Sequence, residues 1–288
     1  MSDNPIAKLV TFALMCLVLL PVLAQQRGVS REEQRSYQVN GTPNVRINNF
    51  DGPIRIEAWD SNQVSYTAEL RGRDQAALDR IEFESSQNGN QILINARLRD
   101  RNWNSWTSVS ITVRVPRQTD LFARTGDGHI EARGVAGEVE LGTGDGHIEA
   151  TNLSGNLNLH TGDGHMTLSD LRGRLRARTG DGSINVRGRF EGLEATTGDG
   201  SMEIVVERGS TVASDWNLRT GDGSIQIALP DDLSAEIEAN SNDGKISSDL
   251  PLMVFGKIGS KALKGRLNAG GKLLSLSTGD GPITLHRN

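Results

Sequence analysis

The chain has 288 residues and a formal net charge of −5, from 31 Lys and Arg against 36 Asp and Glu. Glycine supplies 33 residues, which exceeds the usual share of about 7%, and aromatic residues make up only 4%. The net acidity argues against a nucleic-acid partner, because phosphate contacts need clustered Lys and Arg. Glycine without a strict period of three excludes a collagen-like chain.

Residues 1–24 predict a secretory signal peptide. Lys8 gives a weakly positive start, residues 9–20 are largely apolar, and small residues follow, so we expect cleavage before Gln25. The alternative is an uncleaved anchor, but the apolar run is shorter than the roughly 20 residues that span a bilayer. Cleavage would remove Cys16, the only cysteine, and leave an exported chain without disulfides, thiol ligands or a transmembrane anchor.

A polar segment, residues 25–44, precedes a β-rich N-terminal cap with the first coils, residues 45–124. Alternating apolar residues predict strands at Val45–Ile47, Ile54–Ala58, Val64–Ala68, Ile81–Ser85, Ile92–Ala96 and Val109–Val115. Asp74–Arg80 is the one helical candidate, with Asp74 as its N-cap. Eight of the eleven aromatic residues that follow the signal precede Thr125, and we expect them to cover the open end of a stacked sheet.

Trp103 and Trp106 lie in a polar stretch within this cap. On a loop they could stack on a sugar ring or insert into a partner protein. The alternative is that both cover the end of the apolar core. We therefore name Trp103 and Trp106 as the candidate ligand-binding residues.

The repeat Thr-Gly-Asp-Gly dominates the remainder of the chain. It begins at Thr125, Thr143, Thr161, Thr179, Thr197, Thr220 and Thr278. The first four intervals are 18 residues long, a degenerate copy occupies 241–244, and residues 49–52 resemble a divergent copy. Regular recurrence at this period is typical of a solenoid.

Within each repeat the apolar residues alternate, as in Ile130 and Ala132 after one turn and Val139 and Leu141 before the next. Each unit therefore predicts two short half-buried strands, and Gly137-x-Val139-x-Leu141 is a weaker nine-residue echo of the pattern. One unit cannot bury its apolar side alone, whereas stacked units bury a continuous core. The sequence predicts an all-β, parallel β-solenoid of about 18-residue coils, wound right-handed as parallel crossovers prefer, with coils about 4.8 Å apart.

The Thr-Gly-Asp-Gly residues predict a structural ladder of sharp turns, because Asp caps nearby backbone and glycine tolerates positive φ. On this interpretation Gly146 needs a positive φ. The ladder comprises Gly126, Asp127, Gly128, Gly144, Asp145, Gly146, Gly162, Asp163, Gly164, Gly180, Asp181, Gly182, Gly198, Asp199, Gly200, Gly221, Asp222, Gly223, Asp243, Gly244, Gly279, Asp280 and Gly281. Calcium bound between stacked carboxylates is the alternative, although the spacing does not match calcium-binding nonapeptide rolls.

His129, His147 and His165 share one repeat position, directly after the turn. We expect a solvated polar ladder there rather than a zinc or copper site, and we predict no metal and no cofactor. Residues 125–249 form the regular coils, and residues 250–288 form the C-terminal coils and cap with the only basic concentration. A solvated cap is the favoured interpretation of that basic stretch, with an anion-binding patch as the alternative.

Several motifs together are characteristic of a known family. They are Val45-x-Ile47-x-x-x-Asp51-Gly52-x-Ile54, the serial Thr-Gly-Asp-Gly turns, and the ending Gly-Gly-x-Leu-Leu-x-Leu-x-Thr-Gly-Asp-Gly-x-Ile. Over roughly residues 37–286 the chain resembles the bacterial β-strand-repeat family of unknown function that carries the label "putative adhesin". The resemblance implies a β-solenoid in the periplasm or at the cell surface, and it implies no catalytic residues.

The sequence therefore predicts an exported cell-envelope β-solenoid, adhesin-like or scaffolding, without catalytic activity. Its expected partner is an unknown envelope or surface component, either a glycan or a protein, and not nucleic acid. A carbohydrate- or calcium-binding module is the alternative. An enzyme acting on polysaccharide is a weaker one, because such enzymes need paired carboxylates in a cleft and the short coils leave little room for one.

Overall fold

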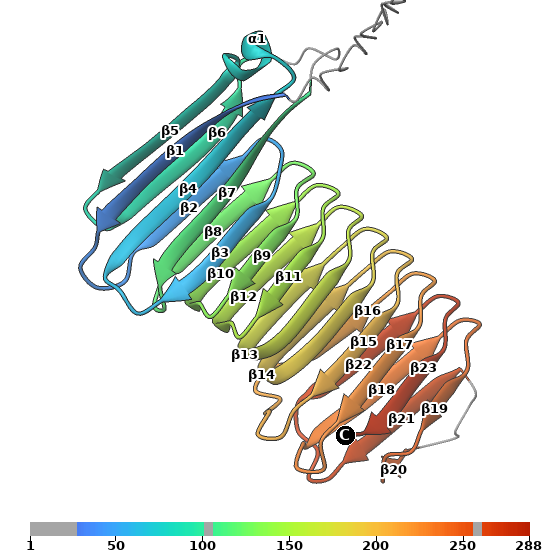
Figure 1. The fold of residues 1–288 in the computed structure, drawn as a ribbon. Coiled ribbons are helices and arrows are strands. Elements are labelled where there is room, and N and C mark those ends of the chain that lie inside the picture. The colour runs from blue at the N-terminus through green and yellow to red at the C-terminus, as the bar shows by residue number, and fades with distance from the viewer. Residues whose placement is uncertain (1–27, 101–105, 256–260) are drawn as a thin grey trace, which may run out of the picture.

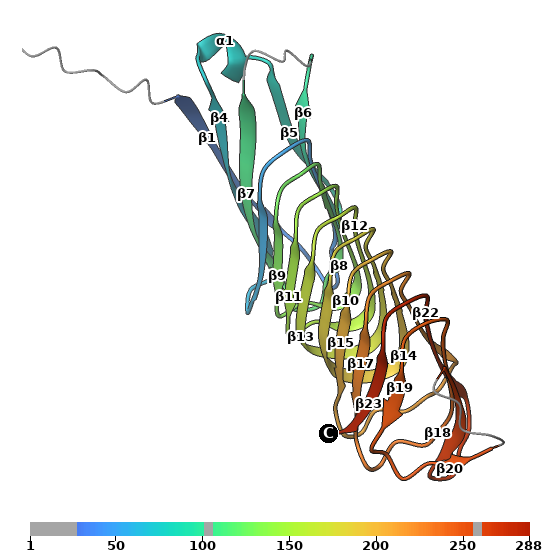
Figure 2. The same cartoon turned by 90° about the vertical axis from the view of Figure 1, so that its right-hand side faces the viewer.

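The structure is a computed structural model that describes residues 28–100, 106–255 and 261–288. In these ranges the chain forms 23 strands and one short helix, α1 (Gln75–Leu78). The strands wind into a long stack of coils with two sheet faces (Figures 1 and 2). The prediction of an all-β chain built from stacked parallel coils is confirmed.

The first face holds the strands that lead into the Thr-Gly-Asp-Gly turns, and we call it the leading face. In spatial order it contains β5 (Ile81–Asn88), β6 (Gln91–Leu98), β2 (Asn44–Asn49), β8 (Asp120–Thr125), β10 (Ala136–Thr143), β12 (Ser154–Thr161), the second halves of β13 (Met166–Arg178) and β14 (Ile184–Thr196), β16 (Trp216–Arg219), β22 (Leu273–Thr278), β18 (Ala235–Ser241), β21 (Ala262–Leu267) and β20 (Met253–Val254).

The second face holds the strands that follow the turns, and we call it the trailing face. In spatial order it contains β1 (Val29–Gln38), β4 (Gln63–Gly72), β7 (Thr107–Pro116), β3 (Ile54–Trp59), β9 (Ile130–Arg133), β11 (Ile148–Thr151), the first halves of β13 and β14, β15 (Met202–Val206), β17 (Ile225–Leu229), β23 (Ile283–Arg287) and β19 (Ile246–Ser248).

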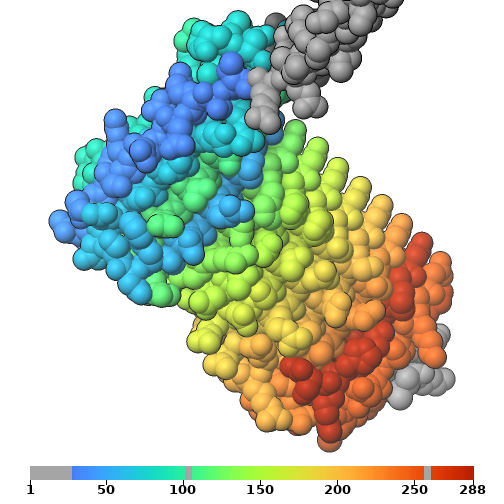
Figure 3. Space-filling model, in the orientation of Figure 1, coloured from blue at the N-terminus to red at the C-terminus, as the bar shows by residue number. Residues whose placement is uncertain are grey.

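Successive coils stack in register. Val139 on β10 pairs with Leu121 on β8 and with Leu157 on β12, each 18 residues away, and all three side chains are buried. The intervening residues, such as Glu140 and Asn158, point outward, as alternation along a strand requires. Each repeat position therefore becomes a row of side chains along the stack, and such rows are visible on its surface (Figure 3).

The Thr-Gly-Asp-Gly turns stack on one another at one edge of the coils. The Thr143 hydroxyl donates hydrogen bonds to the carbonyl oxygens of Gly126 and Gly128 in the preceding coil, at 3.0 and 2.8 Å, and the other threonines do the same. The expectation of a positive φ at Gly146 is wrong, because no glycine of these seven turns adopts left-handed φ. Glycine is needed there because a Cβ on Gly146 would overlap the Gly128 carbonyl oxygen.

Left-handed backbone occurs instead at the opposite corner of each coil. Asn152 has φ 54° and Gly155 has φ 115°, and the corresponding residues of the neighbouring coils share this conformation. The nine-residue echo at Gly137 marks this second corner, where φ is 144°. The two corners of a coil thus use glycine for two different reasons, close approach of the backbone at one and left-handed φ at the other.

The order of coils at both ends differs from chain order. The coil β2–β3 lies between β6–β7 and β8–β9, and the last coil, β22–β23, lies between β16–β17 and β18–β19. Figure 1 shows the blue β3 beside the green β7 and β9. Asp51 therefore precedes Asp127 in the row of turns, and Asp280 lies between Asp222 and Asp243.

The N-terminal cap carries the predicted helix and much of the aromatic content. The Asp74 carboxylate accepts a hydrogen bond from the Ala77 amide at 2.9 Å, so Asp74 is the N-cap of α1, as expected. The rings of Tyr37, Tyr66 and Phe83 pack in sequence, with centroids 6.5 and 5.6 Å apart. The six strands expected in this region all exist, and β1 adds an antiparallel edge strand that was not expected.

Candidate functional site

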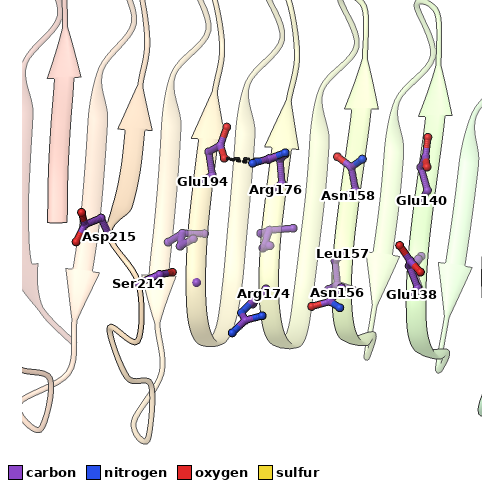
Figure 4. Close-up of a pocket in the computed structure, with 14 residues that line it drawn as sticks. Glu138, Glu140, Asn156, Leu157, Asn158, Arg174, Arg176, Glu194, Ser214 and Asp215 are labelled. Carbon is purple, nitrogen blue, oxygen red and sulfur yellow. Dashed lines mark hydrogen bonds and ion pairs between the residues drawn. The ribbon is translucent and has the colours of Figure 1, made fainter. Parts of the chain in front are cut away.

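A groove of about 320 Å³ lies on the outer surface of the leading face, across β10, β12, β13 and β14. The loop between β15 and β16 closes its far end. The polar lining residues are Glu138, Glu140, Asn156, Asn158, Arg174, Arg176, Glu194, Ser214 and Asp215 (Figure 4). We call this hollow the polar groove.

In-register stacking gathers these residues from separate repeats. Glu138 pairs with Asn156, Asn156 with Arg174, and Arg174 with Gly192, so one outward repeat position forms a row across four strands. A second row, two residues further along each strand, begins at Glu140 and runs through Asn158, Arg176 and Glu194. The two parallel rows form the floor of the groove.

The hollow exists because Gly192 has no side chain. A Cβ there would lie 3.3 Å from Arg174 Cγ and 3.4 Å from Ser214 Oγ, so any larger residue would crowd both. The register between β13 and β14 shifts next to this point, which places Arg174 opposite Gly192 rather than Glu191.

Ion pairs neutralise the second row. Glu140 pairs with Arg124 at 2.7 Å, and Glu194 accepts from both Arg176 and Arg178, at 2.8 and 2.6 Å. Burial alone would raise the pKa of the Glu194 carboxyl, but the hydrogen bonds from Arg178 and Arg176 outweigh it and lower the pKa. Both carboxylates are therefore already occupied by arginines.

The side chains of the first row, and those of Asn158 and Ser214 beside it, are not held by such contacts with other described residues. Five groove side chains make no hydrogen bond or ion pair with any described residue: Glu138, Asn156, Asn158, Arg174 and Ser214. They are exposed to solvent. A carboxylate, two amides, a guanidinium and a hydroxyl thus converge with their hydrogen-bonding capacity free for a ligand.

Of the two aromatic candidates, the structure describes only Trp106, and Trp103 lies outside the described residues. Trp106 is 51% exposed at the cap end, where its carbonyl accepts from the Arg73 amide, and it does not line the polar groove. The groove was not foreseen because its residues occupy outward strand positions, which a single sequence does not distinguish from ordinary solvated surface. The usable signal was that Glu138, Asn156 and Arg174 are spaced by 18 residues.

The turn aspartates form an exposed row on the edge of the stack. Burial, followed by the nearby charge of Asp127, raises the pKa of Asp51, whereas a hydrogen bond from Lys261 at 2.7 Å lowers the pKa of Asp243. Across residues 28–100, 106–255 and 261–288, no group of three His, Cys, Asp or Glu side chains is placed to hold a metal ion.

The three histidines lie in a column in adjacent coils. The ring centroids of His129 and His147 are 3.9 Å apart, and those of His147 and His165 are 4.9 Å apart with the latter pair of rings nearly parallel. His129 Nδ1 lies 3.1 Å from the His147 carbonyl oxygen. Burial, together with the neighbouring histidines, lowers the pKa of His147. The His147 and His165 rings are stacked, and the His129 ring is tilted by 36° relative to that of His147.

The basic residues of the C-terminal cap are largely paired. Lys261 contacts Asp243, Lys264 contacts Glu238 at 2.9 Å, and Arg266 contacts Glu236 at 2.7 Å. The last two pairs join strands β21 and β18, and the first joins residues just outside these strands. No helix long and apolar enough to cross a membrane occurs in the part of the chain that the structure describes.

Comparison with known proteins places the chain in a family. A crystal structure called a "putative adhesin" from Bacteroides fragilis matches with a TM-score of 0.44 and 13% identity, covering 88% of this chain and 97% of that one. A "putative lipid binding protein" from Parabacteroides distasonis matches with a TM-score of 0.45 and 10% identity, covering 88% and 96%. No curated protein matches. The model of the Toastrack DUF4097 family matches residues 43–286, and the protein therefore belongs to the Toastrack DUF4097 family.

Proposed function

We propose that this protein is an exported, non-catalytic binding protein of the bacterial envelope that holds its ligand in the polar groove. The observation that carries the proposal is the set of five groove side chains that have no partner among the described residues. Polar groups that converge on a hollow and leave their hydrogen bonds unused favour ligand binding.

The scaffold supports binding because it holds these groups in place before a ligand arrives. Glu138, Asn156, Asn158 and Arg174 lie on strands whose backbone pairs on both sides, so little backbone conformational entropy is lost there on association. We expect the coils to wind right-handed, because parallel crossovers in one sheet strongly favour that hand.

A non-catalytic role agrees with the state of the groove carboxylates. A general acid needs a pKa raised toward neutrality, whereas the arginine contacts lower the pKa of Glu194. Glu140 is likewise held by Arg124. The groove therefore offers recognition groups, and its Glu194 carboxyl has a pKa shifted away from the range that suits a general acid.

Export is the part of the proposal that rests on residues 1–24, which lie outside the described residues. The full chain with a C-terminal epitope tag should be found in the periplasmic or surface fraction of a bacterial host, with the signal removed. Retention of the uncleaved chain in the cytoplasm would contradict export.

Binding is tested with the purified full chain and washed envelope fractions. The double variant Asn156→Ala, Asn158→Ala should lose most retention on the envelope, because it removes two free amides of the groove. Its matched control is Thr167→Ala, Asn185→Ala, which changes two exposed polar residues on the trailing face. Equal retention of both variants would show that the groove is not the binding site.

A further inference from the structure

We propose that the polar groove binds a glycan segment in which one carboxylated sugar is flanked by neutral ones, and that Arg174 receives the carboxylate. This inference rests on the proposed function and specifies its ligand class. It follows from which charges of the groove are free, which are occupied, and how the rows of side chains are spaced.

Arg174 is the cation of the groove that has no acidic partner among the described residues. Its neighbour Arg176 is held by Glu194 at 2.8 Å, whereas Arg174 stands between Asn156 and Gly192, which carry no charge. Gly192 leaves space beside the Arg174 side chain. A guanidinium matches a carboxylate with two parallel hydrogen bonds, so a ligand carboxylate is its best-fitting partner.

The groups around Arg174 suit hydroxyls. Asn156 and Asn158 each offer an amide donor and an acceptor, Ser214 offers a hydroxyl, and the free carboxylate of Glu138 accepts hydrogen bonds only. Sugar hydroxyls both donate and accept, and so can satisfy each of these groups. A carboxylate such as Glu138 requires a donor, which a hydroxyl supplies and a second ligand carboxylate does not.

The charge of the lining limits how densely the ligand can be charged. Four lining carboxylates, Glu138, Glu140, Glu194 and Asp215, face two arginines, Arg174 and Arg176. A chain with an anion on every unit would bring further negative charge against Glu138 on one side of Arg174 and Asp215 on the other. Like charges brought together at an interface cost affinity, so the groove favours an isolated anion between neutral units.

The row from Glu138 through Asn156 to Arg174 runs along the axis of the stack (Figure 4). Neighbouring strands are about 4.8 Å apart, so the row is a set of contacts at even spacing. An extended chain molecule lying across the strands would meet these residues one after another. This geometry favours a strand of sugars over a compact small molecule.

A peptide is a poorer occupant because the apolar lining residues of the groove are almost completely buried and offer little surface to an anchor side chain: Val139, Leu157, Leu175 and Leu193. The large exposed apolar side chains of the described residues, Trp106, Met253 and Phe255, do not line it. The nearby ring of Phe122 has the guanidinium groups of Arg124 and Arg46 4.5 and 5.3 Å from its centroid. Peptide recognition usually relies on buried aromatic or aliphatic anchors, which this groove does not accommodate.

The test uses the hyaluronan trisaccharide in which one carboxylated sugar lies between two neutral ones, here called the alternating probe, and measures its binding to the full chain by calorimetry. The same trisaccharide with its carboxyl group reduced to an alcohol, and fully carboxylated oligogalacturonate, are the comparison probes. We expect the alternating probe to bind at least about tenfold more tightly than either comparison probe, because it alone offers Arg174 a carboxylate without bringing further negative charge against Glu138.

The variant Arg174→Ala should lower affinity for the alternating probe about tenfold, and its unchanged melting temperature would show that it folds. The matched control Arg187→Ala removes an exposed arginine from the trailing face of the adjacent strand and should bind normally. Gly192→Val, which fills the hollow beside Arg174, should also abolish binding.

Equal binding of the carboxyl-reduced probe, or full binding by Arg174→Ala, would overturn the carboxylated-glycan assignment. If neither carbohydrate binds but the groove variants of the envelope assay still lose retention, the ligand class is wrong and the binding function stands. If the groove variants retain envelope binding, the proposed function fails independently of the glycan result.

Discussion

At the scale of single residues, the same amino acid serves two distinct purposes within one coil. Gly146 faces the backbone of the coil before it, where a Cβ would overlap the Gly128 carbonyl oxygen, and its φ is not left-handed. Gly155 adopts a φ of 115° at the opposite corner. Sequence patterns show that both are glycine but cannot distinguish a close approach from a backbone conformation.

The close-approach argument predicts that Gly146→Ala destabilises the protein by about 3 kcal/mol, the upper range for overpacking, because the clashing atom is backbone and cannot rotate away. Gly142→Ala is the matched control in the same coil. Its Cβ would lie 3.4 Å from Arg124 Cγ, a flexible side chain, so little change is expected. Urea unfolding measures both, and similar midpoints for the two variants would contradict this account of the turn.

At the scale of elements, stacking turns each repeat position into a column whose chemistry depends on its neighbours. His147 is flanked by the rings of His129 and His165, and Glu149 on β11 is the nearby acid that opposes the lowering of its pKa. Burial and the neighbouring histidines together outweigh Glu149. The column therefore favours the neutral form of the His147 imidazole over the protonated form.

Because the pKa of His147 is lower in the folded chain than its ordinary value of 6.5, the unfolded chain binds protons more readily. The column's contribution to stability is present above that value and is lost as the pH falls below it. The melting temperature of the wild type should thus decrease from pH 7 to pH 5. The melting temperature of His147→Asn should decrease less over the same range. His160→Asn, an exposed histidine on the leading face, is the control and should follow the wild type. Parallel pH profiles for wild type and His147→Asn would refute the effect.

At the scale of the whole molecule, the coils at both ends of the stack do not follow their order along the chain. The last segment, with β22 and β23, separates β16–β17 from β18–β19 and pairs with both. β19 has β23 as its only strand partner in the described structure. The coil formed by β22 and β23 is therefore an internal layer of the stack, paired on both sides.

Deleting residues 271–288 should unfold the C-terminal coils and expose the edges of β16 and β17, which promotes aggregation. Deleting residues 28–38 is the comparison, because β1 pairs only with β4 at the outer end of the stack. We expect the C-terminal deletion to lower the melting temperature much more and to yield aggregates by size-exclusion chromatography. A soluble, cooperatively melting C-terminal deletion would disprove the interlocked arrangement.

Much of the fold could be predicted because each repeat carries its own strand pattern. The alternation of Val139 and Leu141 and the 18-residue spacing sufficed to place strands, inward residues and the parallel register. The polar groove could not be predicted, because its hollow depends on Gly192 facing Arg174 after a register shift, and on a loop that brings Ser214 close. Gly192 keeps the 18-residue spacing from Arg174, but an outward glycine does not by itself indicate a hollow, and Ser214 lies on a loop that interrupts the repeat.

The repeating coil follows from the sequence alone, since the side chains that must be buried recur at a fixed interval and identical turns stack on one another. The order of coils at the ends depends on tertiary packing. Parallel strand pairing uses backbone groups common to all residues, so the repeat pattern allows Asp280 to follow Asp222 or Asp243. Only the packed stack resolved this, by inserting the last coil before β18 and β19.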